Sequence, residues 1–174
     1  SLELTCVNGN LTITADAAEM KKVEDIPESC KEQLPTGQIR LTAKTAHPGA
    51  VIKTLIEKNK SPKIATLPTF TGGLVGYFSY DYIKYSEPTL KLDAEDQEHF
   101  KDVDLMLFDK VIAYDNYRQK IVLMINIETE NLEENYVKAV QELEKMEELI
   151  RFGKPAETKA GHLKSEFRPL FDEK

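Results

Sequence analysis

The sequence predicts an α+β fold: mainly antiparallel strands with at least two helices packed on them. Three observations lead to this prediction: several short runs in which apolar and polar residues alternate, an Asn-Gly dipeptide between the first two runs, and two longer segments with apolar residues at helical spacing. The chain has 174 residues, 41% of them hydrophobic, which is the size of one ordinary domain. We therefore expect one domain over residues 1–152 and a linker over 153–174.

The first two strands are expected at 2–6 and 11–15, where Leu, Cys, Ile and Ala alternate with polar residues. Asn8-Gly9 lies between them and tolerates the positive φ that a type I′ turn requires at both central positions. Residues 16–37 contain two prolines and no sustained period, so they predict a connector with one weak helical turn at most.

Later alternating or apolar runs predict further strands at 38–43, 70–82, 105–114 and 120–127. The last two are separated by a connection of hairpin length, so we expect them to be antiparallel neighbours. The segment 85–104 carries Pro88 and an acidic run, and this composition predicts an exposed loop.

Helical spacing predicts two helices. Pro48 suits the first helical position, and the apolar stripe after it predicts a helix over 48–60. The second helix begins after Asn131, an expected N-cap with Glu134 completing a capping box, and ends at Gly153. Residues 128–150 hold eight Glu and two Lys, which we interpret as a solvated helix face with pairs such as Glu134 and Lys138.

Charge and composition exclude several classes of function. The net charge of −7 repels phosphate backbones, so a nucleic-acid partner is not expected. The sequence has no apolar run of about 20 residues and no basic region followed by an apolar run at its start, so a membrane partner is not expected either. Two cysteines are too few for a disulfide framework, which favours the reducing cytoplasm.

The residues alone predict no catalytic, cofactor-binding or metal site. The glycines at 72–76 lack the endings of a phosphate loop and the spacing of a dinucleotide turn. The acidic run 93–98 lacks EF-hand spacing, and the three histidines are scattered. Cys6 is expected on the apolar face of its strand, Cys30 lies in the connector, and Ser79 lacks a nucleophile elbow.

One segment carries a specific resemblance. Residues 68–81, PTFTGGLVGYFSYD, resemble the P-x-F-x-G-G-x-x-G-Y-x-x-Y-D signature in the N-terminal region of anthranilate synthase component I. Ser86-Glu87-Pro88 and residues 104–115 resemble the blocks that follow in that family, in the same order, although Asn116 stands where the family often has His. The resemblance covers roughly residues 1–152.

The resemblance implies a parent enzyme, a lyase of tryptophan biosynthesis that converts chorismate and ammonia to anthranilate and pyruvate. It implies a glutamine amidotransferase subunit as the ammonia source, L-tryptophan as feedback ligand, and Mg²⁺ in a C-terminal chorismate-binding domain. That domain is expected after Lys174, so no catalytic residue, cofactor or metal is assigned to this chain, which we expect to be inactive alone. The implied architecture of the whole enzyme is a layered α/β/β/α sandwich.

The start without Met, directly in a strand pattern, predicts a piece of a longer protein. Its expected structural or feedback-adjacent residues lie in the signature segment: Phe70, Gly72, Gly73, Gly76, Tyr77, Tyr80 and Asp81. We expect the glycines to permit close packing in a central seam of the domain, so that Gly73→Val would be costly through overpacking. Asp81 is expected to cap a backbone or pair with a cation.

Two alternatives remain at this point. The paralogous aminodeoxychorismate synthase component I shares the glycine block. A stand-alone ligand-binding or adaptor module, with the acidic helix docking a basic partner, belongs to a different class.

Overall fold

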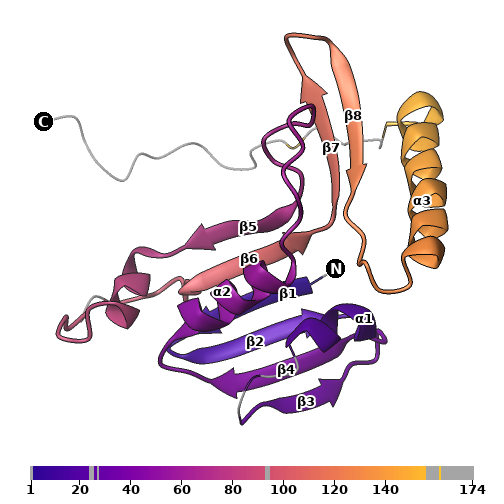
Figure 1. Cartoon of the computed structure of the whole chain (residues 1–174). Coiled ribbons are helices and arrows are strands. Elements are labelled where there is room, and N and C mark those ends of the chain that lie inside the picture. Colours follow the sequence, from indigo (N-terminus) through magenta and orange to yellow (C-terminus); the bar gives the residue numbers. More distant parts are fainter. Residues whose placement is uncertain (1, 24–25, 27, 93–94, 156–160, 162–174) are drawn as a thin grey trace, which may run out of the picture.

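A computed structural model describes residues 2–23, 26, 28–92, 95–155 and 161 (Figure 1). The larger of two sheets is antiparallel with the strand order β3-β4-β2-β1-β6-β5, and the smaller is the hairpin β7-β8. The strands are β1 (Leu2–Val7), β2 (Asn10–Ala15), β3 (Cys30–Gln33), β4 (Ile39–Lys44), β5 (Gly73–Phe78), β6 (Val103–Phe108), β7 (Lys110–Asp115) and β8 (Lys120–Ile125). The helices are α1 (Ala17–Met20), α2 (Pro48–Lys58) and α3 (Leu132–Phe152), with 3₁₀ segments η1 (Lys21–Val23) and η2 (Tyr80–Tyr85). The α+β prediction is confirmed.

The first hairpin forms as predicted. Asn8 and Gly9 have φ values of 49° and 78°, the positive values that a type I′ turn needs at both central positions. The register pairs Leu4 with Ile13, so the apolar residues of both strands share one face of the sheet.

The core lies between that face and the helices. Each strand from β4 to β6 in the sheet order contributes alternate apolar side chains, and Met20, Ile52 and Leu55 cover them from α1 and α2. We call the opposite side of the sheet the outer face. The buried residues on the strands are Leu2, Leu4, Cys6, Leu11, Ile13, Ala15, Leu41, Ala43, Val103, Leu105 and Leu107.

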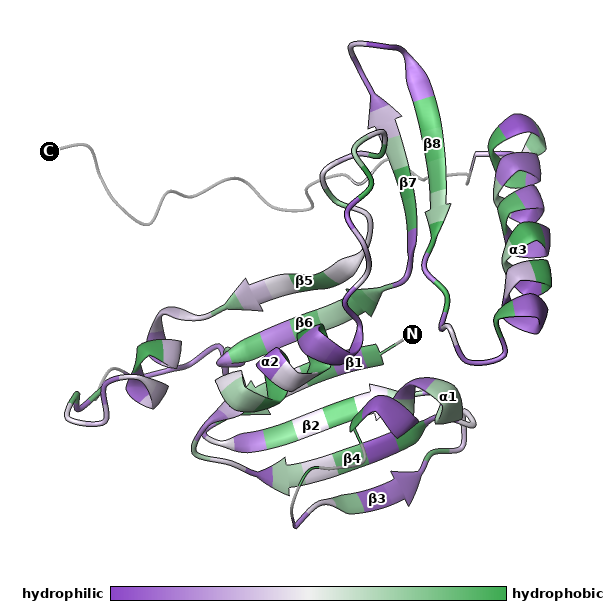
Figure 2. Cartoon of the chain, in the orientation of Figure 1, coloured by the Kyte–Doolittle hydropathy of each residue, from purple (hydrophilic) through white to green (hydrophobic). Residues whose placement is uncertain are grey.

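The smaller unit consists of the β7-β8 hairpin with α3 along β8 (Figure 1). Met124 of β8 is buried, and Lys110 forms a 2.9 Å ion pair with Glu142 of α3. Figure 2 shows hydrophobic residues on β8 and mixed hydropathy along α3. None of the helices among the described residues is long and apolar enough to cross a membrane.

Several sequence-based expectations need correction. The connector 16–37 contains the strand β3 as well as α1. The expected strand over 105–114 is two strands, because the chain turns at Asp109 and leaves one sheet for the other. The expected strand 70–82 ends at Phe78 and continues as η2.

The capping box at the start of α3 does not form. Asn131 adopts left-handed φ and its side chain makes no capping hydrogen bond. Asn135 instead donates from Nδ2 to the carbonyls of Glu128 and Glu130, while Glu134 pairs with Lys138 at 2.6 Å. The predicted solvated pair is thus confirmed, and it takes the side chain that the capping box would have used. Most of the expected linker 153–174 lies outside the described residues.

Candidate functional site

The seven residues that the sequence singles out lie on or beside β5. Phe70 and Gly72 precede this strand, Gly73, Gly76 and Tyr77 belong to it, and Tyr80 and Asp81 begin η2. β5 forms an edge of the six-stranded sheet, so the expectation of a central seam is wrong. The physical reason is that glycine weakens a strand interior, and an edge position tolerates this better than a central one.

Gly76 is the glycine that requires close backbone contact. A Cβ atom at this position would fall on the carbonyl oxygen of Asp104 and lie 2.9 Å from Cα of Leu105, its cross-strand partner. Any larger residue would therefore push β5 away from β6.

Gly72 and Gly73 differ in the space that each leaves for a Cβ atom. A Cβ at Gly72 would lie 2.5 Å from Nδ2 of Asn126 and 2.9 Å from the carbonyl oxygen of Phe108, whereas a Cβ at Gly73 would meet only the Phe70 ring, at 3.9 Å. The overpacking expected at Gly73 is thus not supported. What restricts Gly73 is its φ of 133°, which L side chains rarely adopt.

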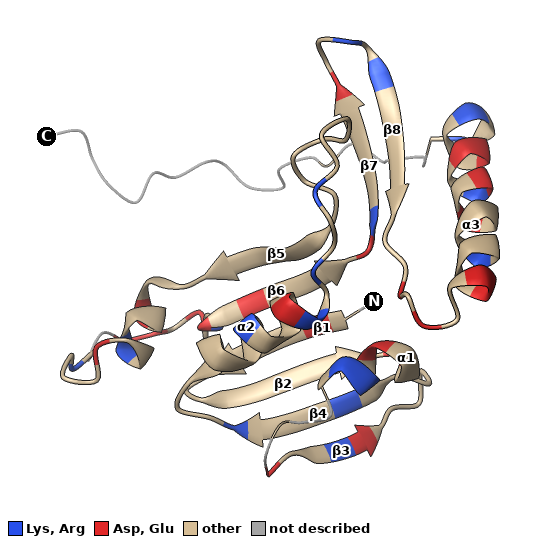
Figure 3. Cartoon of the chain, in the orientation of Figure 1, with Lys and Arg blue, Asp and Glu red and all other residues tan. Residues whose placement is uncertain are grey.

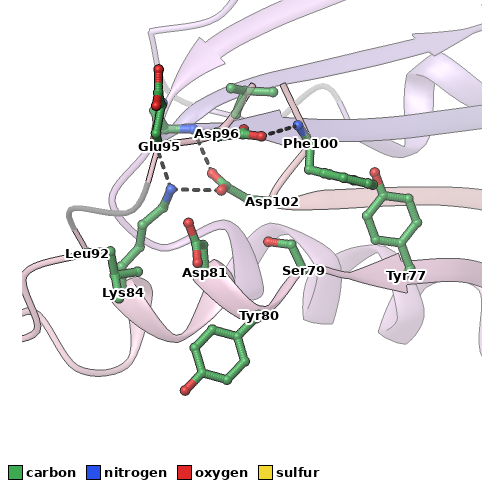
Figure 4. A pocket seen from close by; sticks show the side chains of 12 residues that line it. Tyr77, Ser79, Tyr80, Asp81, Lys84, Leu92, Glu95, Asp96, Phe100 and Asp102 are labelled. Carbon is green, nitrogen blue, oxygen red and sulfur yellow. Dashed lines mark hydrogen bonds and ion pairs between the residues drawn. The ribbon is translucent and has the colours of Figure 1, made fainter. Parts of the chain in front are cut away.

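Three of the seven residues, Tyr77, Tyr80 and Asp81, line an open cleft of about 730 Å³ (Figure 4). The cleft lies between the Asn8-Gly9 turn, η2 and the segment that leads into β6. Phe70 and the three glycines are not among its lining residues. The other lining residues are Val7, Asn8, Ser79, Lys84, Leu92, Glu95, Asp96, Phe100 and Asp102.

Asp102 organises the wall of this cleft. This residue is only 4% exposed, and its Oδ2 accepts hydrogen bonds from the Asn8 amide at 2.6 Å and from the Tyr85 hydroxyl at 2.7 Å. Its Oδ1 accepts from Nζ of Lys84, 2.7 Å away, and the same ammonium donates to the Asn8 side chain at 2.8 Å. The Gly9 amide in turn donates to the Tyr85 hydroxyl at 2.7 Å. We call Asn8, Gly9, Lys84, Tyr85 and Asp102 the Asp102 network.

The network shifts the pKa values of Asp102 and Tyr85 in opposite directions. Burial by itself raises the pKa of Asp102, but hydrogen bonds from Lys84, Tyr85 and the Asn8 amide outweigh it and hold that pKa below its ordinary value. Burial, with hydrogen bonds to Cys6 and Asp102, raises the pKa of the Tyr85 hydroxyl. A charged carboxylate and a neutral phenol are therefore stable near neutral pH, and neither is ready to exchange a proton.

The other polar groups of the cleft are not arranged for catalysis either. Asp81 has no side-chain hydrogen bond or ion pair among the described residues, so the cap or cation pair expected at Asp81 does not form. The carboxylate of this cleft that pairs with a cation is Asp102, with Lys84. The Ser79 hydroxyl is buried and lacks a described partner. No group of three His, Cys, Asp or Glu in the described part of the chain is arranged to hold a metal ion. The geometry is that of a structural network beside an open cleft.

Sequence reasoning missed the residues that do the organising: Asn8, Lys84, Asp102 and Asn126. The sequence predicts only a turn at Asn8, and it predicts an exposed loop over the segment that contains Asp102. A signal was available for Asp102, because Val103, Leu105 and Leu107 alternate directly after it and place the start of a buried strand there. Nothing in the local sequence marks Asn126, whose partners are 17 and 55 residues away.

A family model described as chorismate binding enzyme matches residues 14–173 of this chain. Anthranilate synthase component 1 of Acetivibrio thermocellus is 36% identical over 98 residues, which are 56% of this chain and 20% of that protein. The corresponding protein of Acinetobacter calcoaceticus is 41% identical over 88 residues, 50% of this chain and 18% of the relative. Anthranilate synthase alpha subunit 2, chloroplastic, of Arabidopsis thaliana is 32% identical over 134 residues, 72% of this chain and 21% of the relative. The chain therefore spans about a fifth of the length of the curated relatives it matches.

Proposed function

The chain belongs to the family of chorismate binding enzymes, and on this premise we propose that it is the N-terminal regulatory and scaffolding portion of an anthranilate synthase component I. In this proposal the complete polypeptide converts chorismate and ammonia to anthranilate and pyruvate in the cytoplasm. Its chorismate-binding domain follows this chain, and the chain alone is inactive. Two features of the structure support the scaffolding role.

The first feature is an apolar patch on the outer face of the six-stranded sheet, and it carries the proposal. Val75 of β5 is paired with Met106 of β6, and the two side chains are 47% and 50% exposed. Tyr77 and Phe108 extend this patch along the same strands. Figure 3 shows that β5 carries no charged residue. Charged residues border the patch, because Asp104 lies opposite Tyr77 and forms an ion pair with Lys101. An exposed apolar patch on a sheet face is typical of a surface that packs against another layer.

The second feature is an apolar face on the β7-β8 hairpin. Ile112 lies opposite Leu123, and Tyr114 lies opposite Ile121, so these residues share one face of the hairpin. Ile112, Tyr114 and Ile121 are all exposed. Two exposed apolar sheet faces are what the inner layers of an α/β/β/α sandwich present before the rest of the sandwich covers them.

The remaining parts of the proposal concern ligands and partners. We propose that a glutamine amidotransferase subunit supplies the ammonia and that L-tryptophan inhibits the complete enzyme. Mg²⁺ would be held by the chorismate-binding domain. The described residues of this chain do not fit a Mg²⁺ site, because they contain no cluster of carboxylates at ligand spacing.

The test is an activity assay on the complete polypeptide. Chorismate, ammonium and Mg²⁺ are supplied, and anthranilate is followed by its fluorescence, with pyruvate measured in parallel. Anthranilate formation inhibited by tryptophan is the expected result, with no turnover by residues 1–174 alone. Aminodeoxychorismate as product would assign the chain to the paralogous synthase, and no turnover of chorismate would favour the stand-alone binding module.

The scaffolding role has its own test within the same assay. Val75→Lys places a charge in the apolar patch, whereas Thr42→Lys places one on the exposed outer face of β4, away from the patch. We expect Val75→Lys to abolish activity in the complete polypeptide while leaving residues 1–174 folded, and Thr42→Lys to do neither. Equal activity of the two variants would contradict the proposed docking surface.

A further inference from the structure

Asn126 lies where the two sheets meet. It follows β8 directly, and its side chain is half-buried between the β6-β7 corner and the segment that leads into β5. Its Nδ2 donates to the carbonyl oxygen of Thr71 at 2.7 Å and to that of Asp109 at 3.2 Å. Because both partners are carbonyl oxygens, the amide nitrogen and not the amide oxygen must face them.

The backbone around Asn126 is shaped to admit this side chain. Gly72 leaves the space in which Nδ2 lies, since a Cβ there would approach that nitrogen to 2.5 Å. The backbone N–H of Asn126 also donates to the Asp109 carbonyl, at 2.8 Å, which extends the β7-β8 ladder by one bond. The side chain therefore adds the link to Thr71, which the ladder alone does not provide.

We propose that Asn126 is a clasp that sets the orientation of the β7-β8 hairpin relative to the six-stranded sheet. The β6-β7 connection is the single residue Asp109, and one residue is a pivot that does not fix an angle by itself. A second link at a separate point is needed, and Asn126 supplies it by joining the hairpin to the segment before β5. The ion pair between Lys22 of η1 and Glu128 also spans the two units, at 3.1 Å, but the Glu128 side chain is 51% exposed, and solvent weakens such a pair.

The clasp gives the glycine segment a role beyond close packing. Movement of residues 71–73 would be transmitted through Thr71 and Asn126 to the β7-β8 hairpin. Movement of the hairpin would reach residues 71–73 by the same contact. This inference does not rest on the proposed function, because it concerns two units that are both present in this chain.

The experiment measures the distance between the two units with spin labels. Cys30, which is exposed, is replaced by serine, and labels are placed at Thr42→Cys on β4 and Tyr117→Cys in the hairpin turn, where the side chain is 95% exposed. Asn126→Ala removes the clasp, and Asn126→Asp presents a carboxylate to two carbonyl oxygens. The matched control is Asn135→Ala, which removes an amide that also donates to two backbone carbonyls, but in the segment that leads from β8 into α3.

We expect Asn126→Ala to broaden the distance distribution, Asn126→Asp to broaden it more, and Asn135→Ala to leave it unchanged. Hydrogen exchange at the Asn126 amide should rise roughly tenfold in both Asn126 variants, while amides of β1 and β2 keep their protection. Distributions like that of the parent chain in both variants would overturn the proposal. Loss of β1 and β2 protection would overturn it too, because the side chain would then support the core as a whole.

Gly72 provides an independent check. Gly72→Ala should shift the same distance, because its Cβ displaces the Asn126 amide. In the double variant Gly72→Ala with Asn126→Ala, the change in distance should be smaller than the sum of the two single changes. The reason is that the Asn126 amide, which the Cβ added at position 72 would displace, is then absent. Strict additivity would mean that the two residues act separately and would contradict the clasp.

Discussion

The ammonium group of Lys84 lies 2.7 Å from Oδ1 of Asp102, and the two residues flank a long, acidic segment of the chain. The contact connects η2 to the residue just before β6. Through the Asn8 and Gly9 amides, the same network reaches the first hairpin turn, in contacts between residues 94 and 76 positions apart in the chain. Three segments that are distant in sequence thus meet at one buried carboxylate.

Removing this carboxylate should be costly. Asp102→Ala leaves the Asn8 amide, the Tyr85 hydroxyl and the Lys84 ammonium without their acceptor, and we expect it to lower the free energy of unfolding by about 3 kcal/mol. Asp81→Ala, at another carboxylate of the same cleft, should cost less than about 0.5 kcal/mol. Urea unfolding of both variants measures the difference, and equal midpoints would show that the network contributes no stability.

The same carboxylate predicts a pH dependence. The pKa of Asp102 is lowered in the folded state from its ordinary value of 3.8, because hydrogen bonds to the charged form outweigh burial. The stabilisation is therefore complete above the unfolded pKa and is lost as the pH falls through the folded pKa. The parent chain should lose stability more steeply below about pH 4 than Asp102→Asn does. Parallel curves of unfolding free energy against pH would exclude a lowered pKa at this residue.

The glycines of β5 should differ in their tolerance of a side chain. Gly76→Ala is expected to cost more than about 2 kcal/mol, because β5 must move away from the Asp104 carbonyl. Gly73→Ala has room for its Cβ and should cost about 1 kcal/mol, from its positive φ. Chemical denaturation of the two variants side by side is the measurement. A larger cost at Gly73 would restore the overpacking expected from the sequence.

Tryptophan binding can be tested directly on this chain. The chain contains no tryptophan, so added L-tryptophan would be the sole indole, and its fluorescence anisotropy would report binding. We expect no rise in anisotropy, because the proposed function assigns tryptophan inhibition to the complete polypeptide and not to residues 1–174 alone. Saturable binding at micromolar tryptophan would favour the binding-module hypothesis.

Local patterns were sufficient for part of the fold. The first hairpin, the strand at β4, the helix α2 and the β7-β8 hairpin all followed from alternation, turn residues and helical spacing. Each of these elements depends on residues close together in sequence. The pattern predicts the element because burying one face of a strand or helix requires apolar side chains at a fixed spacing. The corner at Asp109 did not follow, because an apolar run looks the same whether it stays in one sheet or passes to another.

The amino-acid sequence was enough to predict the first hairpin, the helices α2 and α3, the acidic face of α3 and the resemblance of the glycine segment to one enzyme family. The tertiary structure alone decided that β5 is an edge strand, that Asp102 is buried, and that Asn126 bonds to Thr71 across the two sheets. The physical reason is distance along the chain. Alternation and spacing record which face of an element is buried, whereas a hydrogen bond between segments tens of residues apart leaves no local pattern in either one.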